Sequence, residues 1–230
     1  MSKTILLLLL FYAVINPSVN SQDKKIGMPF KNRFSFSLGM GISMSTAPSF
    51  IDYVRNDLPI VNKDSVKSFG VGFEFFGALE YDVSKEFSVK LDYSYFVKNI
   101  SVDYAYFTYN YFYSVHQPYL MGFYVIRKKN YGFKFGAGLG YHFAQMSKDI
   151  GASSNLDYSA SGLGYRGEII FYSNLSKRLG SYVSGFIMGN SIGALKDSNS
   201  NILKNSLTGS DVNLSGFGVG ARLGISFYLN

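Results

Sequence analysis

Apolar and polar residues alternate with a period of two along several stretches of this chain. Between residues 34 and 44, Phe, Leu, Met and Ile occupy the even positions, while Ser and Gly occupy the odd ones. Residues 69–83 alternate in the same way without a change of phase. Successive side chains of a strand point to opposite faces, so this period predicts strands with one apolar face. Three further stretches share it, namely residues 87–97, 131–143 and 217–229.

Three weaker stretches bring the number of predicted strands to eight. Residues 163–171 place Arg166 and Glu168 opposite an apolar face, and residues 182–188 are apolar on both sides. In the third, residues 113–125, we expect five apolar side chains to share one face. These are Val115, Tyr119, Met121, Phe123 and Val125.

The predicted connections alternate between short and long. The short ones are residues 84–85, 127–130 and 176–178, and the long ones are residues 47–67, 99–109, 146–158 and 192–211. An even number of strands with short turns at one end and long loops at the other is typical of a transmembrane β-barrel. Strands cross lipid only as a closed barrel, because every backbone donor and acceptor must then find a partner within the sheet.

A soluble sandwich is the competing interpretation, in which the apolar face forms a core and the polar face meets water. Glycine and serine dominate the polar face here, whereas a solvated face usually carries more Lys, Glu and Thr. The interior of a narrow barrel needs small residues to make room for a few large ones. We therefore predict an all-β fold, an eight-stranded antiparallel up-and-down transmembrane β-barrel.

The first 21 residues have the pattern of a secretory signal peptide. Lys3 supplies a basic start, an apolar run covers residues 5–15, and Pro17 follows. The run is too short for a hydrocarbon core, which needs about 20 helical residues. We expect cleavage after Ser21, then a short periplasmic tail over residues 22–30 and a barrel domain over residues 31–230.

Composition narrows the chemistry. The chain has no cysteine, which excludes disulfides, thiolate zinc sites and thiol catalysis. Its formal charge of +7 is compatible with nucleic acid or with an anionic membrane surface. Many cations fall at the predicted short-turn end, where anionic phospholipid headgroups are available, so we expect outer-membrane lipids as partners and no nucleic acid. They are Lys24, Lys25, Lys31, Lys85, Arg127, Lys128, Lys129, Lys177 and Arg178.

The end of the chain resembles that of the small eight-stranded outer-membrane barrels of Gram-negative bacteria. This porin-like family includes outer membrane proteins X and W and the barrel domain of outer membrane protein A. Arg222, Gly224, Phe227 and Leu229 fit the family's insertion signal, although Asn230 stands where the family usually has an aromatic residue. The resemblance implies an outer-membrane location, reached through a cleaved signal peptide, and the barrel-assembly machinery as a partner during insertion.

Charged residues recur on the face that the barrel would enclose. Because an eight-stranded barrel is only wide enough for side chains to fill it, we expect a neutralised plug rather than a pore. A hairpin turning about Lys85 would place Glu80 opposite Lys90. The predicted luminal charge network is Glu74, Glu80, Lys90, Asp92, Lys134, Arg166, Glu168 and Arg222, with Asp82, Phe76, Tyr124, Tyr172 and Tyr228 also inside.

The two histidines raise the possibility of a metal site. If the fourth and fifth strands turn about Lys129, His116 and His142 become inward-facing neighbours. No carboxylate on either strand is placed to complete a metal site, so hydrogen-bonded rim residues are the expected outcome, with no cofactor. Lipid A acyltransferase and deacylase barrels need a His with a Ser or a carboxylate, and nothing indicates that His142 and Ser147 share a face. We therefore do not expect an enzyme.

The long loops suggest two arrangements. Residues 50–61 are more apolar than a solvated loop requires, and residues 104–113 contain seven aromatic side chains. Either the strands continue past the membrane as a protruding sheet whose open edge can pair with a partner, or these residues form a lid over the mouth. At this rim, Lys67, Lys98 and Lys148 are candidate contacts for lipopolysaccharide phosphates.

Together these features predict an integral, non-enzymatic outer-membrane barrel with a side-chain-filled lumen. It would act through its extracellular loops, in surface interaction with an extracellular partner or in envelope integrity. The alternative is a narrow channel or transporter for small hydrophobic molecules.

Overall fold

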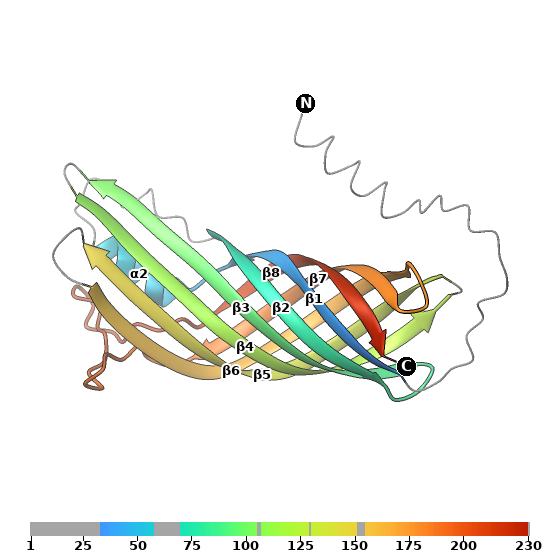
Figure 1. Ribbon diagram of the computed structural model, residues 1–230. Coiled ribbons are helices and arrows are strands. Elements are labelled where there is room, and N and C mark those ends of the chain that lie inside the picture. The colour runs from blue at the N-terminus through green and yellow to red at the C-terminus, as the bar shows by residue number, and fades with distance from the viewer. Residues whose placement is uncertain (1–32, 58–69, 105–106, 129, 151–154, 230) are drawn as a thin grey trace, which may run out of the picture.

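A computed structural model describes residues 33–57, 70–104, 107–128, 130–150 and 155–229. Its sheet is a closed antiparallel barrel of eight strands in chain order, which confirms the predicted fold class (Figure 1). The predicted signal peptide and periplasmic tail lie outside the described residues. The elements are β1 (Phe34–Ser45), α2 (Pro48–Asp57), β2 (Gly70–Asp82), β3 (Phe87–Tyr104), β4 (Phe107–Arg127), β5 (Tyr131–Ile150), β6 (Asn155–Asn174), β7 (Leu179–Ile192) and β8 (Gly216–Leu229).

Each strand pairs with its neighbours in sequence, and β8 closes the barrel against β1. The closing register aligns Phe34 with Leu229. The three short connections lie at one end of the barrel, and β8 ends there too (Figure 1). Lys85, Lys128 and Lys177 are exposed in these connections, as the placement of cations predicted.

Large apolar side chains cover the outside of all eight strands. Leu139 is 72% exposed and Leu163 is 65% exposed, although both lie in the middle of long strands. The inward positions of the same strands are mostly buried and carry Ser, Gly and charged residues together with a smaller number of apolar and aromatic ones. A sheet that exposes its apolar face and encloses its polar face is suited to lipid, because exposing so much apolar surface to water is unfavourable. No helix in the described part of the chain is long and apolar enough to cross a bilayer.

Four consecutive strands are longer than the rest. β3 to β6 have 18 to 21 residues, whereas the other strands have 12 to 14. Their tips form a protruding sheet beyond the apolar belt, at the left in Figure 1. The predicted loops over residues 99–109 and 146–158 are therefore mostly strand, which corrects the prediction. Aromatic residues that favour strands pair across these hairpins, as Tyr111 does with Ile100.

The first long connection contains a helix, α2, at the same end of the barrel (Figure 1). Its buried side chains are Phe50, Ile51, Tyr53 and Val54. They pack in one apolar cluster with residues of the protruding sheet and of the last long connection, residues 193–215. Both predicted arrangements of the loops therefore occur together, since the strands protrude and a helix covers the mouth.

The orientation of β4 differs from the prediction. Val115, Tyr119, Met121, Phe123 and Val125 share a face, as predicted, but that face is buried inside the barrel. Tyr124 is 47% exposed on the outer face, so its predicted luminal position is wrong. Because β4 carries apolar residues on both faces, alternation alone did not determine which face turns inward.

Candidate functional site in the lumen

The eight charged residues predicted for the lumen lie together inside the barrel. Four are carboxylates and four are cations, so the formal charges of the set cancel. They come from five strands, β2, β3, β5, β6 and β8, and the closed register aims all of them inward. The set is Glu74, Glu80, Lys90, Asp92, Lys134, Arg166, Glu168 and Arg222, here called the ionic plug.

Two arginines and two carboxylates form its centre. Arg166 Nη2 lies 2.9 Å from Glu74 Oε1, and Arg222 also contacts that oxygen. On the other side, Arg222 Nη1 lies 2.9 Å from Asp92 Oδ2, and Arg166 Nη1 lies 3.5 Å from Asp92 Oδ1. Each guanidinium therefore joins both carboxylates. All four side chains are at most 1% exposed, so the group has little access to solvent.

Two lysines extend the plug toward the short-turn end. Glu80 and Lys90 are opposite each other in register, as predicted. The Glu80 and Lys90 side chains nonetheless form ion pairs with residues of other strands, because a lysine side chain is long enough to cross the narrow lumen. Lys90 Nζ lies 2.7 Å from Glu168 Oε2, and Lys134 Nζ lies 2.6 Å from Glu80 Oε1. Ser88 and Ser184 donate hydrogen bonds to Glu80 and Glu168, respectively.

Aromatic rings complete the environment of the arginines. The Arg166 guanidinium lies 4.4 Å from the Tyr119 ring centroid and 4.5 Å from that of Phe186. Arg222 lies 4.6 Å from the Phe76 ring centroid. A guanidinium is weakly hydrated and stacks on rings, which makes it suitable for a dry interior. Sequence reasoning missed Tyr119 and Phe186, because β4 and β7 carry apolar residues on both faces.

The outer mouth is closed separately by α2. Asp57 Oδ2 accepts a hydrogen bond from the Tyr111 hydroxyl at 2.5 Å. The same oxygen forms an ion pair with Lys148 Nζ, also at 2.5 Å. Phe50 packs edge-on against Tyr113, with ring centroids 5.4 Å apart. Burial, reinforced by Asp57, raises the pKa of Tyr111 above its ordinary value. The apolar cluster beneath α2 and this polar attachment together are here called the mouth plug.

Sequence reasoning missed α2 and the role of Asp57. A signal was present, because Phe50, Val54 and Asp57 are spaced for one face of a helix. The helix therefore corrects the prediction of an apolar loop in this stretch.

The candidate lipopolysaccharide contacts do not reach the outer surface. Lys98 and Lys148 are 5% and 8% exposed and point into the mouth, so their ammonium groups are turned away from lipid phosphates. Lys67 lies outside the described residues. Lys98 Nζ donates to the Ser45 carbonyl at 3.3 Å, and no carboxylate of the described residues is within ion-pair distance of it. Burial accordingly lowers the pKa of Lys98 to about 8.

The two histidines lie on opposite faces of the sheet, so the prediction that they are neighbours is wrong. His116 pairs in register with Phe143 and points outward, with Nδ1 2.6 Å from the Tyr93 hydroxyl. His142 is buried inside, edge-on to Tyr119. It also faces away from Ser147, which points outward on the same strand. Among the residues that the structure describes, no group of three or more His, Cys, Asp or Glu is placed to hold a metal ion.

The residues of the predicted assembly signal lie on β8. Phe227 and Leu229 are exposed on the lipid side, while Arg222 belongs to the ionic plug. At Gly224 a Cβ would lie 2.6 Å from the Tyr182 ring. A glycine at this position therefore avoids a clash with the Tyr182 ring in the lumen. Recognition by the assembly machinery stays a prediction.

Comparison with known proteins gives structural likeness only. No protein-family model and no curated protein matches the sequence. Among solved structures, the outer membrane protein OprG of Pseudomonas aeruginosa is 12% identical, with a TM-score of 0.49, covering 86% of this chain and 96% of that one. Ail, the attachment invasion locus protein of Yersinia pestis, solved with the heparin analogue sucrose octasulfate, is 10% identical, with a TM-score of 0.47 and coverages of 87% and 100%. Neisserial surface protein A is 9% identical, with a TM-score of 0.46 and coverages of 84% and 96%.

The assignment of the fold and its membrane rests on the chain's own architecture. An even-stranded closed antiparallel sheet, short turns at one end, an outward apolar belt and a polar interior together define the outer-membrane type of barrel. In that type the short turns face the periplasm and the long connections face outward. The chain is therefore an integral outer-membrane β-barrel protein.

Proposed function

We propose that this protein is a non-enzymatic outer-membrane barrel with a closed lumen, and that it acts through its outer surface, in surface interaction or in envelope integrity. The observation that carries the proposal is that side chains fill the lumen at two separate levels. The ionic plug occupies the membrane-embedded part, and the mouth plug occupies the outer end. A barrel filled in this way has its accessible chemistry on the outside.

Conduction would require breaking buried ion pairs. The hollow beside Glu80 and Lys134, on the periplasmic side of the ionic plug, has a volume of only about 20 Å³. That is room for about one water molecule. Removing one partner of a buried ion pair costs about 3–5 kcal/mol, which opposes any spontaneous opening at the centre.

The protruding sheet offers the accessible surface. β2 pairs with β3 only as far as Val97, so residues 98–104 have no strand on that side within the described residues. An open strand edge is a template for pairing with an extended segment of another protein. This edge supports an extracellular protein partner, and the outward belt supports lipid and lipopolysaccharide as partners in the membrane.

Planar bilayers provide the test. Purified full-length protein should give no discrete current steps. A variant in which residues 48–57 are replaced by a Gly-Ser linker should also remain silent, because the ionic plug is intact. Reproducible ohmic steps from the wild-type protein would contradict the closed lumen.

A transporter for small hydrophobic molecules is the second candidate, favoured by the apolar cluster beneath α2. Displacing the helix would expose an apolar chamber at the mouth. In liposomes, this function requires uptake of a small apolar dye that depends on the protein and increases when α2 is replaced by the linker. Equal uptake with and without protein would exclude it.

A further inference from the structure

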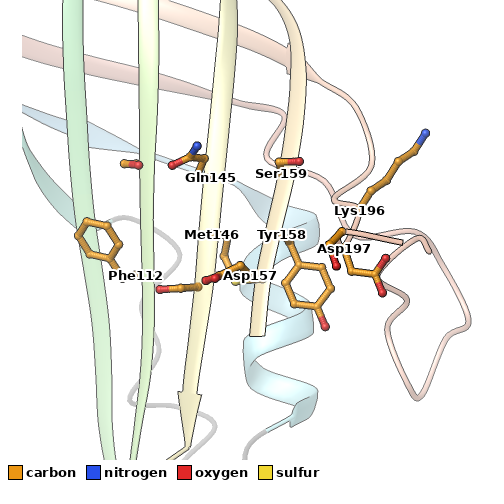
Figure 2. A pocket seen from close by; sticks show the side chains of 11 residues that line it. Phe112, Gln145, Met146, Asp157, Tyr158, Ser159, Lys196 and Asp197 are labelled. Atoms are coloured by element: carbon orange, nitrogen blue, oxygen red, sulfur yellow. The ribbon is translucent and has the colours of Figure 1, made fainter. Parts of the chain in front are cut away.

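A hollow lies on the outward face of the protruding sheet, outside the lumen (Figure 2). Its volume is about 440 Å³, within the range of roughly 300–1,000 Å³ that small-molecule sites occupy. Two cross-strand rows on β4, β5 and β6 form the floor. The first row is Phe112, Ser147 and Asp157, and the second is Ser114, Gln145 and Ser159.

The pairing of the sheet fixes the position of these side chains. The rows are two residues apart on every strand, so all six side chains point to the same face. Residues 196–198 form a wall, because the backbones of Ser159 and Lys196 exchange hydrogen bonds of 2.8 and 2.9 Å. Asp197 stabilises the turn that follows, accepting the backbone N–H of Asn199 at 2.9 Å. The hollow is thus bounded by hydrogen-bonded backbone on two sides.

The side chains in the hollow combine an open ring with strong hydrogen-bonding groups. Phe112 is 41% exposed, which leaves a ring face free for contact. Asp157 and Gln145 are exposed and form no hydrogen bond or ion pair with another described side chain. An aromatic face beside a carboxylate and an amide matches the two surfaces of a sugar, its C–H face and its ring of hydroxyl groups.

The charges of the hollow oppose an anionic ligand. Asp157 and Asp197 both line it, and Figure 2 shows the Lys196 side chain extending away from the three strands. A phosphate or sulfate would meet two carboxylates with no ammonium directed at it. A neutral sugar hydroxyl, by contrast, donates a charge-assisted hydrogen bond to a carboxylate.

The hollow lies at the edge of the apolar belt. Phe143, two residues before Gln145 on β5, is exposed on the same outward face, and Tyr141 follows it toward the membrane. Girdles of aromatic residues flank the apolar band of such barrels at both interfaces, which is consistent with a position of the hollow near the outer headgroups. We propose that this hollow binds an uncharged saccharide, either the sugar part of an outer-leaflet glycolipid or a free saccharide. The proposal requires the outward orientation of the protruding sheet but not a closed lumen.

Binding is tested with full-length protein in phosphatidylcholine nanodiscs. The probe is core oligosaccharide released from lipopolysaccharide by mild acid, then dephosphorylated and carboxyl-reduced so that it carries no charge. Binding is followed by saturation-transfer NMR. Asp157→Asn should weaken binding about tenfold by removing a charged acceptor, and Phe112→Ala about fivefold by removing the ring. Asp149→Asn, on the same strand face but outside the lining, is the matched control and should bind like the wild type.

The outcomes separate this proposal from the closed lumen. Absence of probe binding, equal binding by all variants, or competition by inorganic phosphate would overturn the saccharide site, while bilayer conductance independently tests the lumen. Nanodiscs that contain lipopolysaccharide distinguish the two sources. Weaker binding of the free probe in them identifies a leaflet glycolipid as the occupant, and unchanged binding identifies a free saccharide.

Discussion

Lys148 binds Asp57 across the mouth of the barrel, with Nζ 2.5 Å from Oδ2. One residue is on β5 and the other ends α2, so this ion pair attaches the helix to the barrel wall. Tyr111 of β4 donates to the same carboxylate oxygen, which makes Asp57 the point at which three elements meet.

Replacing Lys148 by methionine should loosen α2 without altering the barrel. Because the pair is largely buried, we expect a loss of about 1.5–3 kcal/mol in the free energy of helix docking. Hydrogen–deuterium exchange of residues 48–57 measures this directly. Asp52→Asn is the control, since the Asp52 side chain is 65% exposed and should be within about 0.5 kcal/mol of the wild type. Unchanged exchange in Lys148→Met would show that the apolar contacts alone hold the helix.

Glu74→Gln should destabilise the whole barrel. Both central arginines share Glu74, so its neutralisation leaves two buried guanidinium groups with one carboxylate fewer. The expected cost is about 3–5 kcal/mol in the free energy of unfolding, measured by urea titration in detergent. Asp149→Asn, exposed on the outer face, serves as the control. A loss below 1 kcal/mol would indicate that water reaches the ionic plug.

Lys98 should make stability depend on pH in the alkaline range. Its pKa in the folded protein is about 8, while an unfolded lysine titrates near about 10.4. Between these values the unfolded chain binds the proton and the folded chain does not, so stability rises as the pH rises from about 8 to about 10.4. Below the folded pKa both states are protonated and Lys98 contributes no slope. The difference in unfolding free energy between the wild type and Lys98→Met, measured at pH 7.5 and pH 10, isolates this effect from other groups. A constant difference contradicts it.

Two glycines should respond oppositely to alanine. A Cβ at Gly220 would lie 2.4 Å from the Phe186 ring, which stacks on both central arginines, so Gly220→Ala should cost about 1–3 kcal/mol through overpacking. At Gly185 on the outer face, a Cβ would meet nothing within 4 Å. Gly185→Ala should therefore be neutral or slightly stabilising in the same urea titration. Equal effects at the two positions would refute the tight fit around Phe186.

The alternation of residues was sufficient to predict the barrel and the members of the ionic plug. A period of two assigns side chains to faces, and the alternation of short and long connections indicates a transmembrane barrel, which encloses the glycine-bearing face and its charged residues. The partners within the plug were not predictable, because Lys90 and Lys134 reach past their register neighbours to carboxylates on other strands. The orientation of β4 was not predictable either, because both of its faces are apolar. Its inward face is the one whose Tyr119 ring stacks with Arg166.

The outer end was harder to predict for a related reason. Polar residues such as Asn99 and Ser101 continue the strands beyond the lipid, whereas in the sequence a change from apolar to polar residues favours the start of a loop. The helical spacing of residues 50–57 was visible in the sequence. Their burial, however, depends on Tyr111, Leu195 and Val212, which come from distant parts of the chain.

Arg222 lies on the final strand, yet it neutralises carboxylates carried by β2 and β3. These acidic groups are therefore short of a counterion until the first and last strands meet. Closure of the sheet and neutralisation of the carboxylates on β2 and β3 therefore occur together. This coupling favours the fully closed barrel over any partly inserted sheet.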